Sequence, residues 1–380
     1  MKLIPYGKQH IDRDDVVSVV KALKSDKITT GTQVLKFEEQ AKKYLNCKYL
    51  ISCSSGTSAL YLALKSINLK SNDVVIMPSM TFVASYNVAR ILGCKIYLAD
   101  IDIKSGQMSP EKIIECCNIN KIKKEKAIIV MYNSGYPENA ERFIKLKKKY
   151  GAIIIEDACH ALGSSYKTDK NFFKIGSCQH ADISTFSLHP LKTITSGEGG
   201  IVTTNSSKIF EKIKLLRSHG IKRNLKKHWH YDVEYNSLNF RLSDIQCALA
   251  LSQLKKINKF IKKRKKISDL YDKFLSKIKL VKINKHNDKY KSSFHLYQIQ
   301  INSKKNIKEK LFKYMLKNKV ILQYHYIPLY KFKVFEQNLS FENTDEYYKK
   351  SISLPIYYDL NLRDQMYIIN KLRDFFKSIH

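Results

Sequence analysis

One lysine of this chain stands apart from the others, and its setting suggests covalent chemistry. Lys192 lies in the stretch SLHPLKTITSGEGG (187–200), among apolar residues and just before a cluster of glycines. Most other lysines lie in charged runs or on polar helix faces. A lysine must be neutral to attack an aldehyde, and partial burial lowers its pKa toward working pH. Glycines let a ligand approach the backbone closely. Lys192 is therefore a candidate nucleophile.

A carboxylate pair ends an apolar run elsewhere in the chain. In IIIEDACHALGSSY (153–166), Glu156 and Asp157 follow three isoleucines, and His160 lies close by. A carboxylate at a buried strand end is costly unless it has a cationic or strongly donating partner. Such an aspartate is either a core residue bonded to backbone amides or an acid that faces a cationic ligand.

A third feature suits a phosphate group. In SCSSGTSALYLAL (52–64), Gly56 and Thr57 stand at the start of an amphipathic helix. Free N–H groups and the positive end of the helix dipole favour an anion there, although the same residues also form an ordinary helix start.

Together the three features match the needs of a pyridoxal phosphate site. Gly56 and Thr57 would anchor the phosphate, Asp157 would keep the pyridine nitrogen protonated, and Lys192 would form the Schiff base. A protonated ring withdraws electrons from the carbon that must lose a proton, and a nearby carboxylate stabilises that charge. The sequence therefore indicates pyridoxal 5'-phosphate as the cofactor.

The elements that position these residues form an α/β pattern. Strands that are apolar throughout are usually buried on both faces, which predicts a largely parallel sheet covered by helices. Ligands of such sheets collect beyond the carboxyl ends of the strands. The predicted strands are 73–78, 95–100, 126–132, 152–158, 182–188 and 199–205, and the predicted helices are 57–67, 84–92, 110–119, 140–150 and 207–217.

The pattern of apolar residues changes after Arg241. One long helical pattern begins at Ser243 or Asp244, with apolar residues every three to four positions, and shorter strands such as 294–301 follow. We expect a large cofactor-binding domain over residues 1–250 and a smaller α+β domain over residues 251–380. A cleft should lie where the two domains meet.

Composition narrows the class of protein. No apolar run approaches the roughly 20 residues of a membrane helix, and Met1 to Gly7 have no apolar signal core, which predicts a cytoplasmic protein without membrane contact. Eight cysteines without metal-ligand spacing predict reduced thiols and no metal site.

The formal net charge is +34, but the lysines form no single tract and no nucleic-acid-binding motif is present. Nor does GEGG (197–200) open a helix after a first strand, as a nicotinamide-binding fingerprint would.

The motifs resemble those of the DegT-type sugar-nucleotide aminotransferases, which are pyridoxal phosphate enzymes of fold type I, like aspartate aminotransferase. The resemblance runs almost end to end, through SSGTSAL, EDACHALGSSY, DISTFSLHPLKTITSGEGG, NFRLSDIQCALALSQLKKI and ILQYHYIPLY. DACHALGSSY, RSHGIKR and YYKKSISLPIYYDLNLRD resemble the branch that serves pseudaminic acid biosynthesis. That branch implies amino transfer from L-glutamate to C4 of a UDP-linked 4-keto-6-deoxy-N-acetylhexosamine, which gives a 4-amino sugar nucleotide and 2-oxoglutarate.

The resemblance also implies roles for individual residues. Lys192 and Asp157 would be catalytic, Phe82 would stack on the cofactor ring, and Asn239 would reach the phosphate from a neighbouring subunit, so a homodimer with shared sites is expected. The implied cofactor-binding residues are Gly56, Thr57, Phe82, Asp157, His160, Ser187, Lys192 and Asn239. The implied substrate-binding residues are Tyr6, Lys27, Thr29, Thr30, His189, Arg241, His325 and Tyr326.

Several alternatives stay open at this point. Phe82 could be plain core, His325 a buried histidine with its own partner, and Tyr6 part of an N-terminal tether. A sugar dehydratase is disfavoured, because that branch typically has histidine in place of Lys192. The family pattern is broken at 134–136 and at Ser237, so another 4-keto sugar, such as one of the bacillosamine or legionaminic acid pathways, is an alternative substrate.

Overall fold

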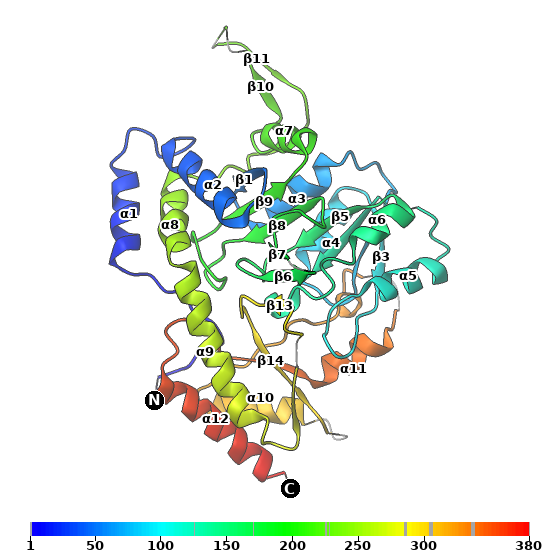
Figure 1. Cartoon of the computed structure of the whole chain (residues 1–380), viewed down its shortest axis with the longest axis vertical. Coiled ribbons are helices and arrows are strands. Elements are labelled where there is room, and N and C mark those ends of the chain that lie inside the picture. The colour runs from blue at the N-terminus through cyan, green and yellow to red at the C-terminus, as the bar shows by residue number, and fades with distance from the viewer. Residues whose placement is uncertain are drawn as a thin grey trace.

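The centre of the protein is a seven-stranded sheet flanked by helices (Figure 1). The computed structural model describes residues 2–379 apart from 125, 170, 225, 228, 285, 286, 304–306 and 336–338. The sheet has the order β1-β9-β8-β5-β4-β2-β3. Its strands are β1 (Tyr49–Cys53), β2 (Val74–Pro78), β3 (Lys95–Ala99), β4 (Ala127–Met131), β5 (Ile153–Asp157), β8 (Ile183–Ser187) and β9 (Gly200–Thr204).

The largely parallel character predicted for this sheet is confirmed. Strands β3, β2, β4, β5 and β8 pair in parallel, whereas β9 runs antiparallel to both β8 and β1. All six predicted strands are present, and β1 is an additional strand. Its apolar run is interrupted by buried Ser52, whose amide and hydroxyl both bond to Glu38. Because this polar residue breaks the apolar run, pattern analysis misses the strand.

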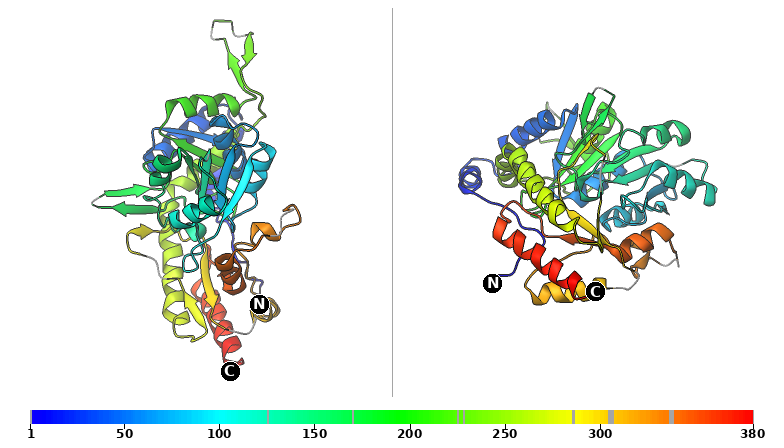
Figure 2. Two further views of the ribbon diagram at one scale, coloured as in Figure 1. Left: turned by 90° about the vertical axis from the view of Figure 1, so that its right-hand side faces the viewer. Right: turned by 60° about the horizontal axis from the view of Figure 1, so that its bottom comes forward.

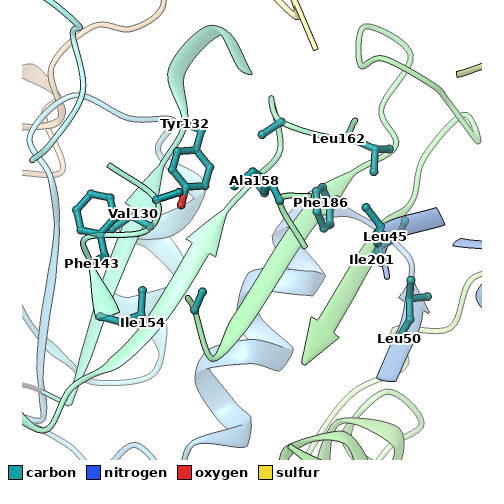
Figure 3. Close-up of a cluster of buried hydrophobic side chains, with 14 of the residues drawn as sticks. Leu45, Leu50, Val130, Tyr132, Phe143, Ile154, Ala158, Leu162, Phe186 and Ile201 are labelled. Atoms are coloured by element: carbon teal, nitrogen blue, oxygen red, sulfur yellow. The ribbon is translucent and has the colours of Figure 1, made fainter. Parts of the chain in front are cut away.

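Alternate residues of each strand face two separate layers of helices. Ile128 and Ile154 belong to one hydrophobic cluster and their neighbours Ile129 and Ile155 to the other. Figure 3 shows part of the first cluster, in which Phe186 of β8 is fully buried. Helices α2 (Thr32–Leu45), α5 (Pro110–Ile119), α6 (Ile144–Tyr150) and α8 (Asp244–Lys255) contribute to the first cluster, and α3 (Gly56–Ser66), α4 (Ala84–Ile91) and α7 (Ser207–Leu216) to the second.

The predicted long helix proves to be two helices in succession. It begins as expected, since Ser243 caps α8 in a capping box with Gln246. It is then interrupted at Lys256, and α9 (Ile257–Leu275) follows. The Lys256 amine pairs with Asp12 and Asp15, at 2.7 and 2.8 Å, at the start of α1 (Arg13–Leu23). The sequence pattern could not reveal this break, because these partners lie about 240 positions away.

Two other boundaries also differ from the prediction. Helix α6 begins at Ile144, since residues 140–143 form turns, and the strand predicted over 294–301 is β14 (Tyr297–Ile301). Phe294, at the predicted start of that strand, has a positive φ of 54°, which is incompatible with extended backbone.

The C-terminal part packs around a small antiparallel sheet of order β12-β14-β15. Its strands are β12 (Val281–Ile283), β14 and β15 (Ser351–Leu354), and its helices are α10 (Lys308–Lys317), α11 (Glu342–Lys350) and α12 (Leu362–Lys377). The third hydrophobic cluster covers this sheet and also includes Ile4, so the N-terminal segment packs on the C-terminal part. Within α9, Phe260 belongs to the first hydrophobic cluster and Ile267 to the third. The domain boundary at residue 250 remains a prediction.

Two small antiparallel sheets lie outside the central and C-terminal sheets. The hairpin of β10 (Ile221–Arg223) and β11 (Tyr231–Val233) projects well beyond the body of the molecule (Figures 1 and 2). A second small sheet joins β6 (Ser165–Thr168), β7 (Asn171–Lys174) and β13 (Tyr290–Lys291). Within the described ranges, none of the helices combines the length and the apolar character needed to cross a membrane.

Candidate active site

A cavity of about 360 Å³ lies beyond the carboxyl ends of β5 and β8. Asp157 ends β5 and Ser187 ends β8, and these strands are neighbours in the sheet. The N-terminus of α3 borders the same cavity through Gly56 and Thr57. The sheet thus brings together three of the features that the sequence predicted, as the rule for open α/β sheets leads one to expect.

Lys192 lies in the connection between β8 and β9 and lines this cavity. The connection is closed at its base, because Leu188 accepts a hydrogen bond from the amide of Ser196 at 3.0 Å and donates its own amide to Gly199 at 2.8 Å. Burial lowers the pKa of the Lys192 amine, while nearby Cys159 and Asp157 oppose the shift. The lysine is therefore held in a fixed loop and biased toward its neutral, nucleophilic form.

Asp157 is a buried carboxylate whose described partners are all neutral. Ser85 Oγ donates to Oδ2 at 3.1 Å, and the amide of Cys159 donates to Oδ1 at 3.3 Å. No ion pair involves Asp157 within the part of the chain that the structure describes. A buried anion with only two long neutral hydrogen bonds favours a cationic ligand in the cavity that it faces.

The start of α3 forms a tight cradle. The Ser55 side chain caps the helix by accepting from the amide of Ser58. A Cβ atom added at Gly56 would come within 2.8 Å of Ser187 Cβ, so only glycine allows β8 to approach the helix end this closely. The first amides of a helix have no partner within it, and they suit a phosphate.

Aromatic side chains also line the cavity. The Tyr326 hydroxyl and His160 Nε2 lie 2.8 Å apart, and His160 Nδ1 is buried with no partner among the described residues. Phe82 is 52% exposed and its ring centre lies 5.8 Å from that of Tyr326. The possibility that Phe82 is plain core is therefore wrong, because its ring is open toward the cavity. His325 lines the cavity and also has a protein partner, since its Nδ1 lies 2.8 Å from Ser353 Oγ.

Sequence reasoning missed His295, which lies against His160 with ring centres 4.2 Å apart. It precedes β14, and its Nδ1 is buried without a partner in the described chain. The available sign was a histidine at the start of an apolar strand pattern, which is common for a core histidine. Only the tertiary contact between the segment before β14 and the loop after β5 places this residue in the cavity.

The predicted site residues divide into two groups. Tyr6 and His189 join the others in the cavity, but five predicted residues do not. Those five are Lys27, Thr29, Thr30, Asn239 and Arg241. Thr30 and Arg241 line a separate basic hollow of about 1150 Å³, and exposed Asn239 accepts a hydrogen bond from the Arg241 amide. Their predicted roles remain predictions.

The buried imidazoles should make the protein sensitive to acid. Burial lowers the pKa of His160 and His295, and that of His325 to about 3. An unfolded histidine takes up its proton near pH 6.5, so these groups stabilise the fold at neutral pH and lose that contribution as pH falls. We expect the free energy of unfolding, measured in urea, to fall between pH 7 and pH 4. His325→Gln should reduce that slope by up to about 1.4 kcal/mol per pH unit. An unchanged slope would contradict the assignment.

Comparison with known proteins identifies the family. Residues 9–373 match the model of the DegT/DnrJ/EryC1/StrS aminotransferase family. The chain belongs to this family. The resemblance and fold class inferred from the motifs are thereby confirmed, and the protein is an aminotransferase-family member of α/β fold type I.

Individual members of the DegT/DnrJ/EryC1/StrS family are similar over almost the whole chain. The UDP-4-amino-4,6-dideoxy-N-acetyl-β-L-altrosamine transaminase of Campylobacter jejuni is 38% identical, over 97% of this chain and 96% of the relative. PseC of Helicobacter pylori, an aminotransferase involved in the biosynthesis of pseudoaminic acid, superposes with a TM-score of 0.92 at 31% identity, over 99% of this chain and 100% of PseC. A Streptococcus pneumoniae protein assigned as a sugar aminotransferase, solved in its PLP form, gives a TM-score of 0.90 at 25% identity over the whole of both chains.

The residues of this DegT-family cavity fit pyridoxal phosphate. The glycine cradle at α3 suits the phosphate, and the carboxylate of Asp157 suits a protonated ring nitrogen. The unpartnered Nδ1 of buried His160 suits a polar ring substituent, and the amine of Lys192 suits an aldehyde. Each match rests on a group that has weak or no partners within the described chain.

Proposed function

We propose that this protein is a pyridoxal-phosphate-dependent aminotransferase that moves an amino group from L-glutamate to C4 of a UDP-linked 4-keto-6-deoxy-N-acetylhexosamine. The products would be UDP-4-amino-4,6-dideoxy-N-acetyl-β-L-altrosamine and 2-oxoglutarate. The names of the relatives from C. jejuni and H. pylori support this sugar. We place the reaction in the cytoplasm, where a nucleotide sugar and glutamate are both available.

One observation gives the main support for this type of reaction. Lys192 and Asp157 line a single cavity. Asp157 ends β5, and Lys192 lies in the loop after β8, the strand that pairs with β5. Burial lowers the pKa of the amine, and the acid forms no ion pair among the described residues. An aldehyde and a cationic ring on one ligand would satisfy both groups at once.

Each residue of the cavity would have its own role in the amino transfer. Pyridoxal phosphate, when bound, supplies an aldehyde that takes up the amino group and a protonated ring that draws electrons from the carbon losing its proton. Asp157 would hold the proton on the ring nitrogen, and Gly56, Thr57 and Ser187 would hold the phosphate. Lys192 Nζ would remove the proton from the α-carbon of glutamate and later deliver one to C4 of the sugar. One positioned base of this kind contributes about 10²- to 10⁴-fold.

The aromatic wall would orient the substrates and exclude water. Tyr6, Phe82 and Tyr326 present their rings to the cavity. Ring faces bury apolar surface, and the Tyr6 hydroxyl offers a hydrogen bond, whereas that of Tyr326 lies 2.8 Å from His160 Nε2. We propose that this wall receives the hexose ring, with the UDP part extending outward.

We also propose that the active unit is a homodimer, in which Asn239 and Arg241 serve the partner's cavity. Neither residue lines the cavity of its own chain. Large apolar side chains are exposed on α1 and around the projecting hairpin, which is typical of surfaces that bind another protein. They are Val16, Val17, Val20, Leu23, Trp229, Tyr231, Val233 and Leu238.

Mixing two impaired variants at a low concentration of pyridoxal phosphate would test this dimer. Lys192→Ala lacks the base, whereas Asn239→Ala is expected to bind the cofactor weakly. If sites are shared, a mixed dimer contains one cavity with both functional residues, so unfolding and refolding the mixture should restore activity. A mixture that stays inactive although light scattering shows dimers would contradict the sharing of sites.

The reaction itself is tested with purified protein, glutamate and a panel of UDP-4-keto sugars of different stereochemistry. We expect glutamate to shift the visible absorption band of the protein, and the altro-configured product to form fastest. A preference for a gluco- or galacto-configured product would keep the reaction type but replace the sugar. Protein that stays colourless with added pyridoxal phosphate would contradict the proposal.

A further inference from the structure

His325 is held at two points by facing residues of β14 and β15. Its Nδ1 lies 2.8 Å from Ser353 Oγ, and its carbonyl accepts from Gln298 Nε2 at 3.0 Å. Gln298 and Ser353 lie directly opposite each other in the strand pair. Gln298 Oε1 in turn accepts from Ser134 Oγ at 2.7 Å, which fixes the orientation of the amide. The strand pair therefore determines how the imidazole is presented to the cavity.

The hydrogen bond between Ser353 and His325 can run in only one direction without loss. Ser353 is fully buried, and His325 Nδ1 is the one partner of its hydroxyl within the described chain. If the imidazole donated, the hydroxyl proton would be left buried without an acceptor, which is unfavourable. The serine hydroxyl therefore donates to Nδ1.

This direction determines where the ring carries its own proton. Burial lowers the pKa of His325 to about 3, so the ring is neutral at physiological pH. A neutral imidazole has one N–H, and the nitrogen that does not accept a hydrogen bond carries it. With Nδ1 accepting from Ser353, the proton lies on Nε2, the nitrogen left for the cavity.

Few cationic side chains line the cavity, so a neutral hydrogen-bond donor such as this N–H is suited to bind an oxygen of the substrate. The cavity lining, as far as the structure describes it, contains no arginine, and Lys192 is its one lysine. We propose that Ser353 is a positioning residue that holds His325 as the neutral Nε2–H tautomer, which donates a hydrogen bond to an acceptor oxygen of the bound substrate. The identity of that oxygen rests on the proposed function: it belongs either to a carboxylate of glutamate or to the carbonyl of the keto sugar.

The tautomer is tested directly by nitrogen NMR of histidine-labelled protein, independently of any activity. The His325 resonances are assigned by their loss in His325→Gln. In the wild-type protein we expect a protonated Nε2 and an unprotonated Nδ1. Ser353→Ala should give a mixture of tautomers, because the hydroxyl that selects one of them is gone.

A matched control comes from the same strand. Ser351 is also buried, two residues away on β15, and Ser351→Ala should leave the His325 resonances unchanged. A protonated Nδ1 in the wild type would overturn the inference, and so would identical His325 spectra in Ser353→Ala and the wild type.

Kinetics of the separate half-reactions identify the acceptor oxygen. Ser353→Ala should raise KM about tenfold for the substrate that His325 contacts, with little change in kcat. A rise for glutamate alone assigns the carboxylate, and a rise for the sugar alone assigns the carbonyl. Equal losses of kcat in both half-reactions would overturn the inference in favour of a merely structural role. If neither substrate reacts with the wild type, the proposed function fails, but the NMR result still decides the tautomer.

Discussion

Replacing Lys192 with alanine is expected to abolish transamination, with a fall in kcat/KM of about 10⁴-fold or more, because both the attacking amine and the positioned base are lost. The fold should survive, since the side chain projects into a cavity rather than into packed core. The measurement is 2-oxoglutarate formation, together with urea unfolding of both proteins. Borohydride reduction of the wild type should leave the cofactor attached to the peptide that contains residue 192.

A second half-buried lysine provides the control for that experiment. Lys174 also has a pKa lowered by burial, but its amine bonds to the carbonyl of Tyr44, and it does not line the cavity. Lys174→Ala should retain wild-type activity. Attachment of the reduced cofactor to any peptide other than that of Lys192, or full turnover by Lys192→Ala, would contradict the assignment.

Asp157→Asn is expected to lower kcat/KM by about 10²- to 10⁴-fold. The amide keeps the size of the side chain and can still accept from Ser85, but it no longer offers a charge to a protonated ring. Removing one partner of a buried ion pair typically costs about 3–5 kcal/mol, which corresponds to a fall of this size. The visible absorption of the bound cofactor and steady-state rates with glutamate would measure the effect.

The adjacent carboxyl group is the matched control. Burial raises the pKa of Glu156, and the side chain accepts from Tyr132 and Ser184 on the side of the sheet away from the cavity. Its stabilising contribution is therefore complete at low pH and is lost as pH rises through the raised pKa. Glu156→Gln should keep activity and make stability less dependent on pH. Equal losses of activity in the two variants would show that Asp157 acts through packing rather than charge.

The boundaries of the predicted elements show where pattern reasoning succeeds. Six of the seven strands of the central sheet are short, mostly apolar runs, so their sequences alone predict them. The interruption at Lys256 coincides with ion pairs to Asp12 and Asp15, about 240 positions away, and strand β1 contains Ser52, whose partner Glu38 lies on the preceding helix. Local patterns contain no information about such partners.

The sequence by itself determined six of the seven strands of the central sheet, the helix end at Gly56 and the candidate chemistry of Asp157 and Lys192. These residues lie at or next to strand and helix ends, and a parallel sheet places its carboxyl ends along one edge. The tertiary structure alone decided that His295 and Ser353 belong to the site and that Asn239 lies outside the cavity of its own chain. The physical reason is that the segments next to β14 and β15 and the segment of His325 and Tyr326 reach the cavity through contacts over more than 100 positions, such as that between Tyr326 and His160.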